Sequence, residues 1–192
     1  MKQNPLAVLA AAVRKMNLPN RLTLLRIALV PVYLLLLWLP AYKELALLVF
    51  AAASLTDFFD GRIARKHGLI TNFGKFMDPI ADKLLTHTAF IMLTAMGRLN
   101  VVACILFIAR EFVVSGLRLV AVEQGRVIAA GMSGKVKTVL QMALVMVLTA
   151  RLQIGSGLFS LTGLLTLATA VMTLYSMVEY VWQNRAVLGG EK

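Results

Sequence analysis

Residues 44–65 read ELALLVFAAASLTDFFDGRIAR, and residues 76–97 read FMDPIADKLLTHTAFIMLTAMG. Each run is about as long as the roughly 20 mainly apolar residues that cross a bilayer. Together they nevertheless hold every aspartate of the chain: Asp57, Asp60, Asp78 and Asp82. An acidic side chain near the bilayer centre costs roughly 2.5 to 3.5 kcal/mol on insertion scales. Four of them within one 26-residue stretch indicate a functional site in a membrane protein.

The composition of the whole chain supports this interpretation. Hydrophobic residues make up 59% of the 192 residues and the mean hydropathy is +0.80, whereas soluble domains have about 45 to 50% apolar residues. We therefore predict an all-α integral membrane protein, a bundle of about six transmembrane helices preceded by a short interfacial N-terminal helix. The expected spans are residues 22–40, 44–65, 76–97, 99–123, 138–151 and 157–182, the fifth beginning within residues 131–137.

These spans leave no room for a soluble domain, so one membrane domain is expected over residues 1–192. Its expected parts are the interfacial segment at residues 1–20, the six-helix bundle at residues 21–185 and a cytoplasmic tail at residues 186–192. Arg14 and Lys15 directly follow the apolar residues 6–13, which favours an interfacial helix over a signal peptide.

The formal net charge of +11 is explained by membrane topology rather than by nucleic-acid binding. Lys and Arg collect in cytoplasmic loops. With a cytoplasmic N-terminus the outer turns hold only Lys43, Arg98 and Arg151, and the other 17 of the 20 basic residues lie at inner ends, in inner loops or within spans. We expect a multi-pass protein of the plasma membrane, with both termini and the aspartate site on the cytoplasmic side and no nucleic-acid partner.

The aspartates fall on two helical stripes. At the helical period, the stripes comprise Asp57, Asp60, Gly61 and Ala64, within an arc of about 100°, and Gly74, Asp78 and Asp82, which step by four. Small residues also mark close helix packing in membranes, so Gly61 and Ala64 suit either packing or a flat ligand ring.

Carboxylates this close together require divalent cations to offset their repulsion. Hard oxygen ligands favour Mg²⁺ or Mn²⁺ over zinc, and neither His67 nor His87 has a ligand partner at helical spacing. Two such ions about 4 Å apart are the usual apparatus of phosphoryl transfer. The same acids would also suit the cation or proton pathway of a transporter, and the spacing of the motif separates these alternatives.

That spacing is Asp57-x-x-Asp60-Gly61-x-x-Ala64-Arg65-x8-Gly74-x3-Asp78-x3-Asp82. With every fixed position filled, the chain resembles the CDP-alcohol phosphotransferase family, whose six-helix bundle covers nearly the whole sequence. The resemblance implies transfer of a phosphate-linked group from a CDP-linked donor to an alcohol, with release of CMP. It further implies that Asp57, Asp60, Asp78 and Asp82 bind two divalent ions and that Asp82 is also the general base. Asp60, Gly61, Ala64, Arg65 and Gly74 would bind the donor.

The acceptor is predicted from basic residues elsewhere in the chain. Arg110, Glu111 and Arg118 share an arc of about 100° on one span, and Lys135 and Lys137 lie at the start of the next, where the helix dipole favours phosphate. Guanidinium groups bind phosphate in a bidentate manner, so an acceptor that already carries a phosphate is expected. A structural Arg110–Glu111 pair and a solvated pair of lysines are the alternatives.

Three stretches narrow the resemblance: residues 17–27 (NLPNRLTLLRI), 109–118 (AREFVVSGLR) and 134–138 (GKVKT). They are similar to the bacterial phosphatidylglycerophosphate synthases within the family. This implies CDP-diacylglycerol as donor, bordered by Thr23 and Arg26, and glycerol 3-phosphate as acceptor, held by Arg110, Arg118, Lys135 and Lys137. It also implies that the protein forms a homodimer and that membrane lipid surrounds it.

Other functions remain as alternatives at this point. The same family includes enzymes with other acceptors, namely a second phosphatidylglycerol in cardiolipin synthesis, an inositol phosphate, or serine, but an uncharged acceptor gives the basic residues no purpose. A cation transporter commonly contains inverted repeats and broken helices, which this sequence does not display. A membrane scaffold leaves the four aspartates unexplained.

Overall fold

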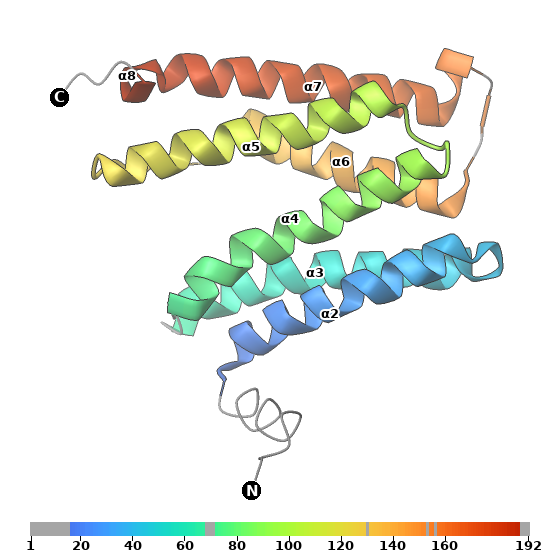
Figure 1. Ribbon diagram of the computed structural model, residues 1–192, viewed down its shortest axis with the longest axis horizontal. Coiled ribbons are helices and arrows are strands. Elements are labelled where there is room, and N and C mark those ends of the chain that lie inside the picture. The colour runs from blue at the N-terminus through green and yellow to red at the C-terminus, as the bar shows by residue number, and fades with distance from the viewer. Residues whose placement is uncertain (1–15, 68–71, 130, 153, 156, 189–192) are drawn as a thin grey trace, which may run out of the picture. The chain divides into compact units, whose positions relative to one another are not determined.

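The computed structural model describes residues 16–67, 72–129, 131–152, 154–155 and 157–188, without the side chains of residues 19, 57–67, 72–76, 78–79, 82, 158 and 188. Within these ranges the chain forms helices and no strands (Figure 1). The elements are α2 (Leu18–Trp38), η1 (Pro40–Tyr42), α3 (Lys43–His67), α4 (Asn72–Ala95), α5 (Val101–Glu123), α6 (Met132–Ala150), η2 (Gly157–Phe159), α7 (Leu161–Gln183) and α8 (Arg185–Leu188).

The all-helical fold predicted from the sequence is confirmed, and each of the six expected spans overlaps one of the helices α2 to α7. The helix of the fifth span begins at Met132, inside the expected stretch. Among the described residues, three helices are long and apolar enough to cross a membrane: Asn20–Trp38, Met132–Ala150 and Leu161–Gln183. Six spans remain a prediction. The expected interfacial helix falls mostly in residues 1–15, outside the described residues.

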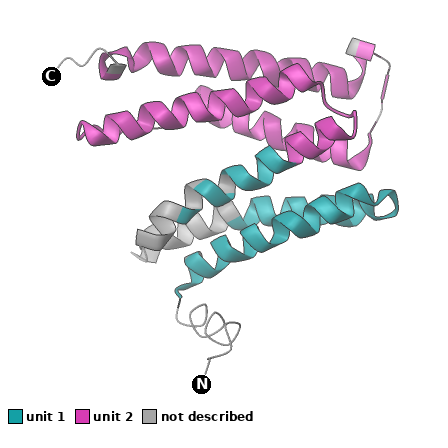
Figure 2. Ribbon diagram, in the orientation of Figure 1, with its two compact units in different colours: residues 1–88 teal, residues 89–192 magenta. Residues whose placement is uncertain are grey.

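The chain divides into two compact units, residues 1–88 and residues 89–192, with the boundary inside α4 (Figure 2). In unit 1, the short η1 turn connects α2 to α3, and these two helices pack along each other. The rings of Tyr33 and Phe50 lie 5.4 Å apart between their centroids. Ala46 and Ala53 are fully buried, and small side chains of this kind let two helices approach closely.

In unit 2, α7 packs against both α5 and α6. The buried face of α7 carries hydroxyl side chains at helical spacing, including Thr169, Thr173 and Ser176. Each hydroxyl donates to a carbonyl in the preceding turn, as Thr173 Oγ1 does to Thr169 O at 2.7 Å. Because the helix itself satisfies these groups, α7 buries a polar but compact face against its neighbours.

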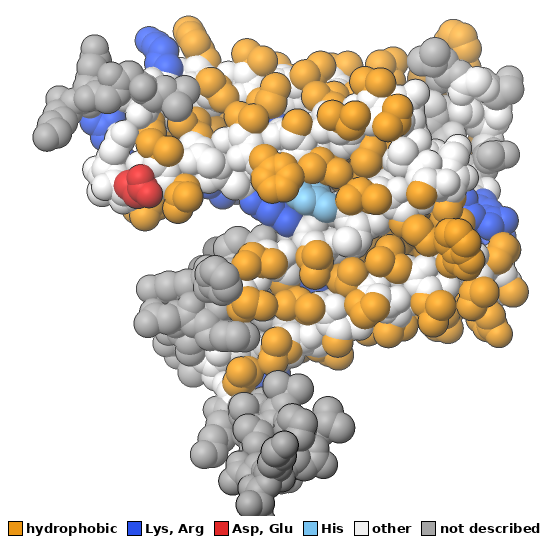
Figure 3. All heavy atoms as spheres, viewed as in Figure 1, with side chains coloured by type: hydrophobic (Ala, Val, Ile, Leu, Met, Phe, Trp, Pro, Cys, Tyr) orange, Lys and Arg blue, Asp and Glu red, His pale blue; other side chains and the backbone are white. Residues whose placement is uncertain are grey.

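Large hydrophobic side chains point outward along the helices (Figure 3). Leu35, Val102 and Trp182 are each more than 60% exposed. Exposed apolar surface of this extent is rare on soluble monomers and marks contact with a membrane or another protein. Together with the apolar helices, it indicates that lipid is the solvent for much of this surface.

Candidate functional site

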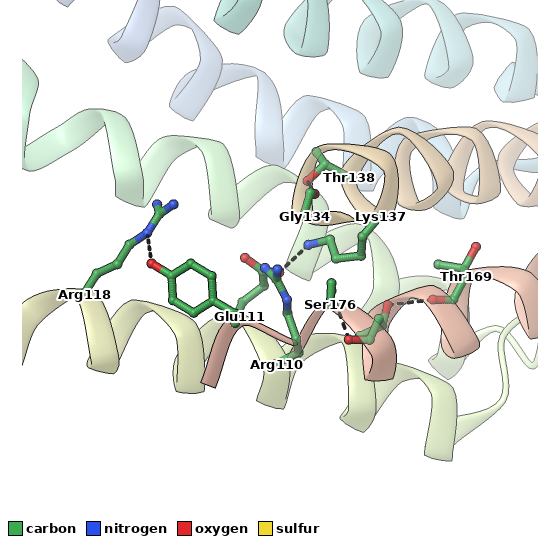
Figure 4. Close-up of polar contacts among 10 residues, drawn as sticks. Arg110, Glu111, Arg118, Gly134, Lys137, Thr138, Thr169 and Ser176 are labelled. Atoms are coloured by element: carbon green, nitrogen blue, oxygen red, sulfur yellow. Dashed lines mark hydrogen bonds and ion pairs between the residues drawn. The ribbon is translucent and has the colours of Figure 1, made fainter. Parts of the chain in front are cut away.

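A buried charge cluster joins α5 to α6. Arg110 of α5 is 6% exposed and Lys137 of α6 is 2% exposed. Arg110 Nη1 donates to Glu111 Oε1 at 2.9 Å, and Lys137 Nζ donates to the same oxygen. Figure 4 shows both cationic side chains converging on this carboxylate. The Arg110–Glu111 pair, an alternative raised from the sequence, is thus present, but Lys137 shares it.

In the described part of the chain, the cluster joins two buried cations to one carboxylate, and Lys137 takes part in a further interaction within the fold. Arg110 Nε is buried without a hydrogen-bond partner among the described residues. The same holds for Nε2 of Gln141, which is 4% exposed and lies one helical turn beyond Lys137. Unsatisfied buried donors are unfavourable. This arrangement therefore suits the binding of an anion.

The start of α6 leaves room for the guanidinium group of Arg110, because two glycines stand there. Gly131 caps the helix without a side-chain hydrogen bond, and Gly134 follows within the first turn. A Cβ atom on Gly134 would lie 3.2 Å from Arg110 Nη2, which is closer than ordinary van der Waals contact. Thr138 Oγ1 donates to Gly134 O at 3.0 Å and so stays within its own helix. Glycine at position 134 lets the guanidinium lie directly against the backbone of α6.

The other two predicted acceptor residues lie elsewhere in unit 2. Arg118 lies about two turns beyond Arg110 on α5, and its Nε donates to the hydroxyl of Tyr180 on α7 at 2.9 Å. Its guanidinium carbon is also 5.7 Å from the centroid of the Tyr180 ring. Lys135 is exposed in the first turn of α6. The structure thus brings Arg110 and Lys137 together and joins Arg118 to Tyr180, and the phosphate-binding roles stay predictions.

The predicted donor residues lie on the first three helices described. Thr23 and Arg26, three residues apart on α2, are each 1% exposed, and both take part in interactions within the fold. The signature residues are placed by backbone alone: Asp57, Asp60, Gly61, Ala64 and Arg65 on α3, and Gly74, Asp78 and Asp82 on α4. Their side chains lie outside the described ones.

A metal centre among the aspartates also stays a prediction. Among the residues that the structure describes, no three His, Cys, Asp or Glu side chains are grouped so that they could hold a metal ion. That statement does not extend to the four aspartates. The donor set itself, four carboxylates on two consecutive helices, has the hard oxygen chemistry that Mg²⁺ and Mn²⁺ prefer.

The family model described as CDP-alcohol phosphatidyltransferase matches residues 16–178, most of the chain. The chain belongs to the CDP-alcohol phosphatidyltransferase family. The resemblance carried by the aspartate signature is thereby confirmed. The match includes all eight signature positions, the cluster around Glu111 and most of α7.

Several members of the CDP-alcohol phosphatidyltransferase family are similar to this chain. A protein of Rickettsia bellii named CDP-diacylglycerol--glycerol-3-phosphate 3-phosphatidyltransferase is 48% identical over 66% of this chain and 71% of its own. A Bacillus subtilis protein of the same name is 44% identical over 64% of this chain and 70% of its own. A probable phosphatidylglycerophosphate synthase of Mycobacterium tuberculosis is 38% identical over 95% of this chain and 88% of its own.

The sequence of this CDP-alcohol phosphatidyltransferase did not point to three residues that lie beside the predicted acceptor residues. Gln141 had a usable signal, since it lies four positions after Lys137 and therefore on the same helical face. Gly134 begins the stretch 134–138 that carries part of the family resemblance, but its proximity to Arg110 depends on packing between helices. Tyr180 had no local signal at all, because it is 62 residues from Arg118 in the sequence.

Proposed function

We propose that this chain transfers the phosphatidyl group of CDP-diacylglycerol to glycerol 3-phosphate, giving phosphatidylglycerol phosphate and CMP in phospholipid biosynthesis. Membership of the family and the names of its relatives support the reaction. One structural observation supports a phosphorylated acceptor above the others. Arg110 and Lys137 are both buried and share the carboxylate of Glu111, and Arg110 Nε has no hydrogen-bond partner in the described part of the chain.

The acceptor phosphate, in this proposal, binds beside the shared carboxylate. Arg110 Nε is a buried donor without a partner in the described part of the chain, and a phosphate oxygen would satisfy it. Lys137 adds charge from the opposite helix. Arg118, whose Nε is already engaged by Tyr180, would contribute from its remaining guanidinium nitrogens. Lys135, exposed in the first turn of α6, would attract the phosphate as it arrives.

The donor head group, in this proposal, is bound by the aspartate signature. Asp57, Asp60, Asp78 and Asp82 would hold two divalent ions, Mg²⁺ or Mn²⁺, which neutralise charge on the diphosphate. The smaller residues Gly61, Ala64 and Gly74 would leave room for the cytidine, and Arg65 would pair with phosphate. Thr23 and Arg26, buried on α2, would border the head group.

Asp82 acts as the general base in this scheme. It accepts the proton of the glycerol 3-phosphate hydroxyl, whose oxygen then bonds to the phosphorus of the phosphatidyl group. The bond from that phosphorus to CMP breaks, and CMP leaves. A base of this kind works within about 3 Å of the proton it removes. Asp82 follows Asp78 by one turn of α4, so the two lie on the same helical face.

A lipid donor and a soluble acceptor require a site close to one membrane surface. We propose a bundle of six spans in a bacterial plasma membrane, with both termini and the aspartates on the cytoplasmic side, as the distribution of Lys and Arg favours. We also propose that two copies of the chain form a homodimer.

The reaction is tested by counting CMP released from CDP-diacylglycerol by the purified protein with Mg²⁺ or Mn²⁺. Glycerol 3-phosphate is expected to support release, whereas phosphatidylglycerol, inositol phosphate and serine are not. CMP release with one of those acceptors but not with glycerol 3-phosphate would reassign the acceptor within the family. Cation flux into proteoliposomes, without nucleotide binding, would instead indicate a transporter.

A further inference from the structure

Two adjoining cavities lie at the end of unit 2 where α5 and α7 begin and α6 ends. One has a volume of about 470 Å³ and the other about 520 Å³, within the range of roughly 300 to 1,000 Å³ that ligand pockets span. Arg98 and Thr162 line both of them. From this end, α5 runs nine helical steps from Val101 to Arg110, or about 14 Å. The cavities are therefore separate from the cluster around Glu111.

Two helix ends of the same type place an arginine at these cavities. After α4, Gly97 has a φ of 69° and the Arg98 N–H donates to Leu93 O at 2.8 Å. After α6, Arg151 itself has a φ of 56°, and the N–H of the next residue donates to Val147 O at 3.2 Å. Glycine is the usual residue at this left-handed position, where another residue costs roughly 1 to 2 kcal/mol. In this chain Arg151 occupies the left-handed position after α6, at the edge of the second cavity.

The charge at this end of unit 2 is positive. Arg98 and Arg151 both line the second cavity, and no carboxylate is among its described lining residues. The described acidic residues of unit 2, Glu111, Glu123 and Glu179, lie at or beyond the middle of α5 and α7, toward the other end. Guanidinium groups bind phosphate through paired, charge-assisted hydrogen bonds. The two arginines are thus complementary to an anionic phosphate group.

The first cavity continues as an apolar groove between α5 and α7. Polar side chains of Asn100, Ser160 and Thr162 stand at its mouth, and Leu106 and Ala170 lie farther along. The ten helical steps from Ser160 to Ala170 correspond to about 15 Å of groove at the helical rise. That is about half of the roughly 30 Å hydrocarbon core of a bilayer. A polar mouth followed by an apolar groove of this length matches one lipid in one leaflet.

We propose that this end of unit 2 binds an anionic phospholipid from the leaflet that the predicted topology makes the outer one. Its phosphate lies between Arg98 and Arg151, and one acyl chain lies in the groove between α5 and α7. The site is distinct from the charge cluster around Glu111, which lies about 14 Å farther along α5. Its occupancy does not depend on the transfer reaction.

The experiment uses the full-length protein in detergent with phosphatidylglycerol that carries a diazirine in its acyl chain. After irradiation, peptide mass spectrometry is expected to find label on α5 within residues 101–106 and on α7 within residues 166–170. The double variant Arg98→Gln/Arg151→Gln is expected to bind this lipid at least about tenfold more weakly, because charge-assisted hydrogen bonds are lost. Ala170→Phe, which fills the groove, should also reduce the label.

Three controls distinguish the possible outcomes. Lys43→Gln removes a basic residue of the outer turns that does not line the cavities and is expected to leave labelling unchanged. Arg98→Lys/Arg151→Lys retains the charges and should restore much of the labelling. Diacylglycerol with the same diazirine lacks the phosphate and should label these peptides several-fold less.

Equal labelling of α5 and α7 by diacylglycerol would overturn the proposal, as would unchanged labelling in the glutamine double variant when that variant elutes as a monodisperse protein. Inorganic phosphate tests the second source of the same chemistry. If phosphate alone protects the wild-type protein against heat as well as phosphatidylglycerol does, and does so through Arg98 and Arg151, the site binds a soluble anion and the lipid assignment is wrong.

Discussion

Lys137 of α6 and Arg110 of α5 donate to the same oxygen, Oε1 of Glu111. The three side chains are largely buried, and even the most exposed of them, that of Glu111, is only 16% exposed. One carboxylate thus partly neutralises two cations that would otherwise repel each other across two helices.

Glu111→Gln is expected to destabilise the protein while strengthening its interaction with phosphate. Removing one partner of a buried ionic group leaves uncompensated charge and costs about 3 kcal/mol or more. The thermal midpoint in detergent should therefore fall, and added glycerol 3-phosphate should recover more of it than in the wild-type protein. Glu123→Gln, at the exposed end of α5, is the matched control and should change neither quantity. A Glu111→Gln protein as stable as wild type would show that the carboxylate does not compensate the two cations.

Gly134→Ala is expected to separate substrate binding from stability. The new methyl group would lie 3.2 Å from Arg110 Nη2, so the guanidinium must move by a few tenths of an ångström. We expect the KM for glycerol 3-phosphate to rise several-fold. Alanine also favours a helix over glycine by about 1 kcal/mol, so the thermal midpoint should not fall. Gly116→Ala on α5, where a Cβ meets nothing within 4 Å, is the control and should leave the KM unaltered.

Tyr180→Phe is expected to weaken the link between α5 and α7. The substitution removes the oxygen that accepts from Arg118 Nε at 2.9 Å but keeps the ring beneath the guanidinium. A hydrogen bond to a charged group contributes about 1.5 to 3 kcal/mol. Thermal unfolding of Tyr180→Phe, Arg118→Gln and the double variant would measure the coupling between the two side chains. Tyr175→Phe, on the exposed side of α7, should be neutral; additive effects of the first two substitutions would contradict the link.

Asp82→Asn is expected to abolish turnover more completely than it weakens donor binding. An amide cannot accept the hydroxyl proton, so CMP release should fall by at least about 10²-fold, the lower end of what a general base contributes. Stabilisation by CDP-diacylglycerol in the presence of Mg²⁺ should persist in part, since three aspartates remain. Glu179→Gln on α7 serves as a carboxylate control. A near-normal rate in Asp82→Asn would remove this residue from the role of base.

Removal of divalent ions should weaken binding of the CDP-linked donor and leave binding of glycerol 3-phosphate unchanged. Chelation with EDTA is expected to eliminate CMP release and the thermal stabilisation by CMP, and either Mg²⁺ or Mn²⁺ should restore both. Stabilisation by glycerol 3-phosphate should survive chelation, because Arg110 and Lys137 supply its charge. If CMP stabilises the protein equally with and without divalent ions, the aspartates do not bind the donor through metal.

The sequence by itself determined the helices and the family. Apolar runs long enough to span a bilayer predicted α2 to α7, because hydrophobic length and periodicity are local properties. The aspartate signature is likewise local, since its eight positions lie within 26 residues and a fixed spacing on two helices is readable without a structure. The match of the family to residues 16–178 confirms what that signature predicted.

Only the tertiary structure decided how the basic residues are grouped. The sequence placed Arg110, Arg118, Lys135 and Lys137 together as one set, whereas packing divides them. Lys137 meets Arg110 through Glu111, Arg118 turns to Tyr180, and Lys135 lies exposed. The partners are 26 and 62 residues apart in the chain. Helical periodicity gives the face on which a side chain lies, but the rotation and approach of the neighbouring helix decide which charge it meets there.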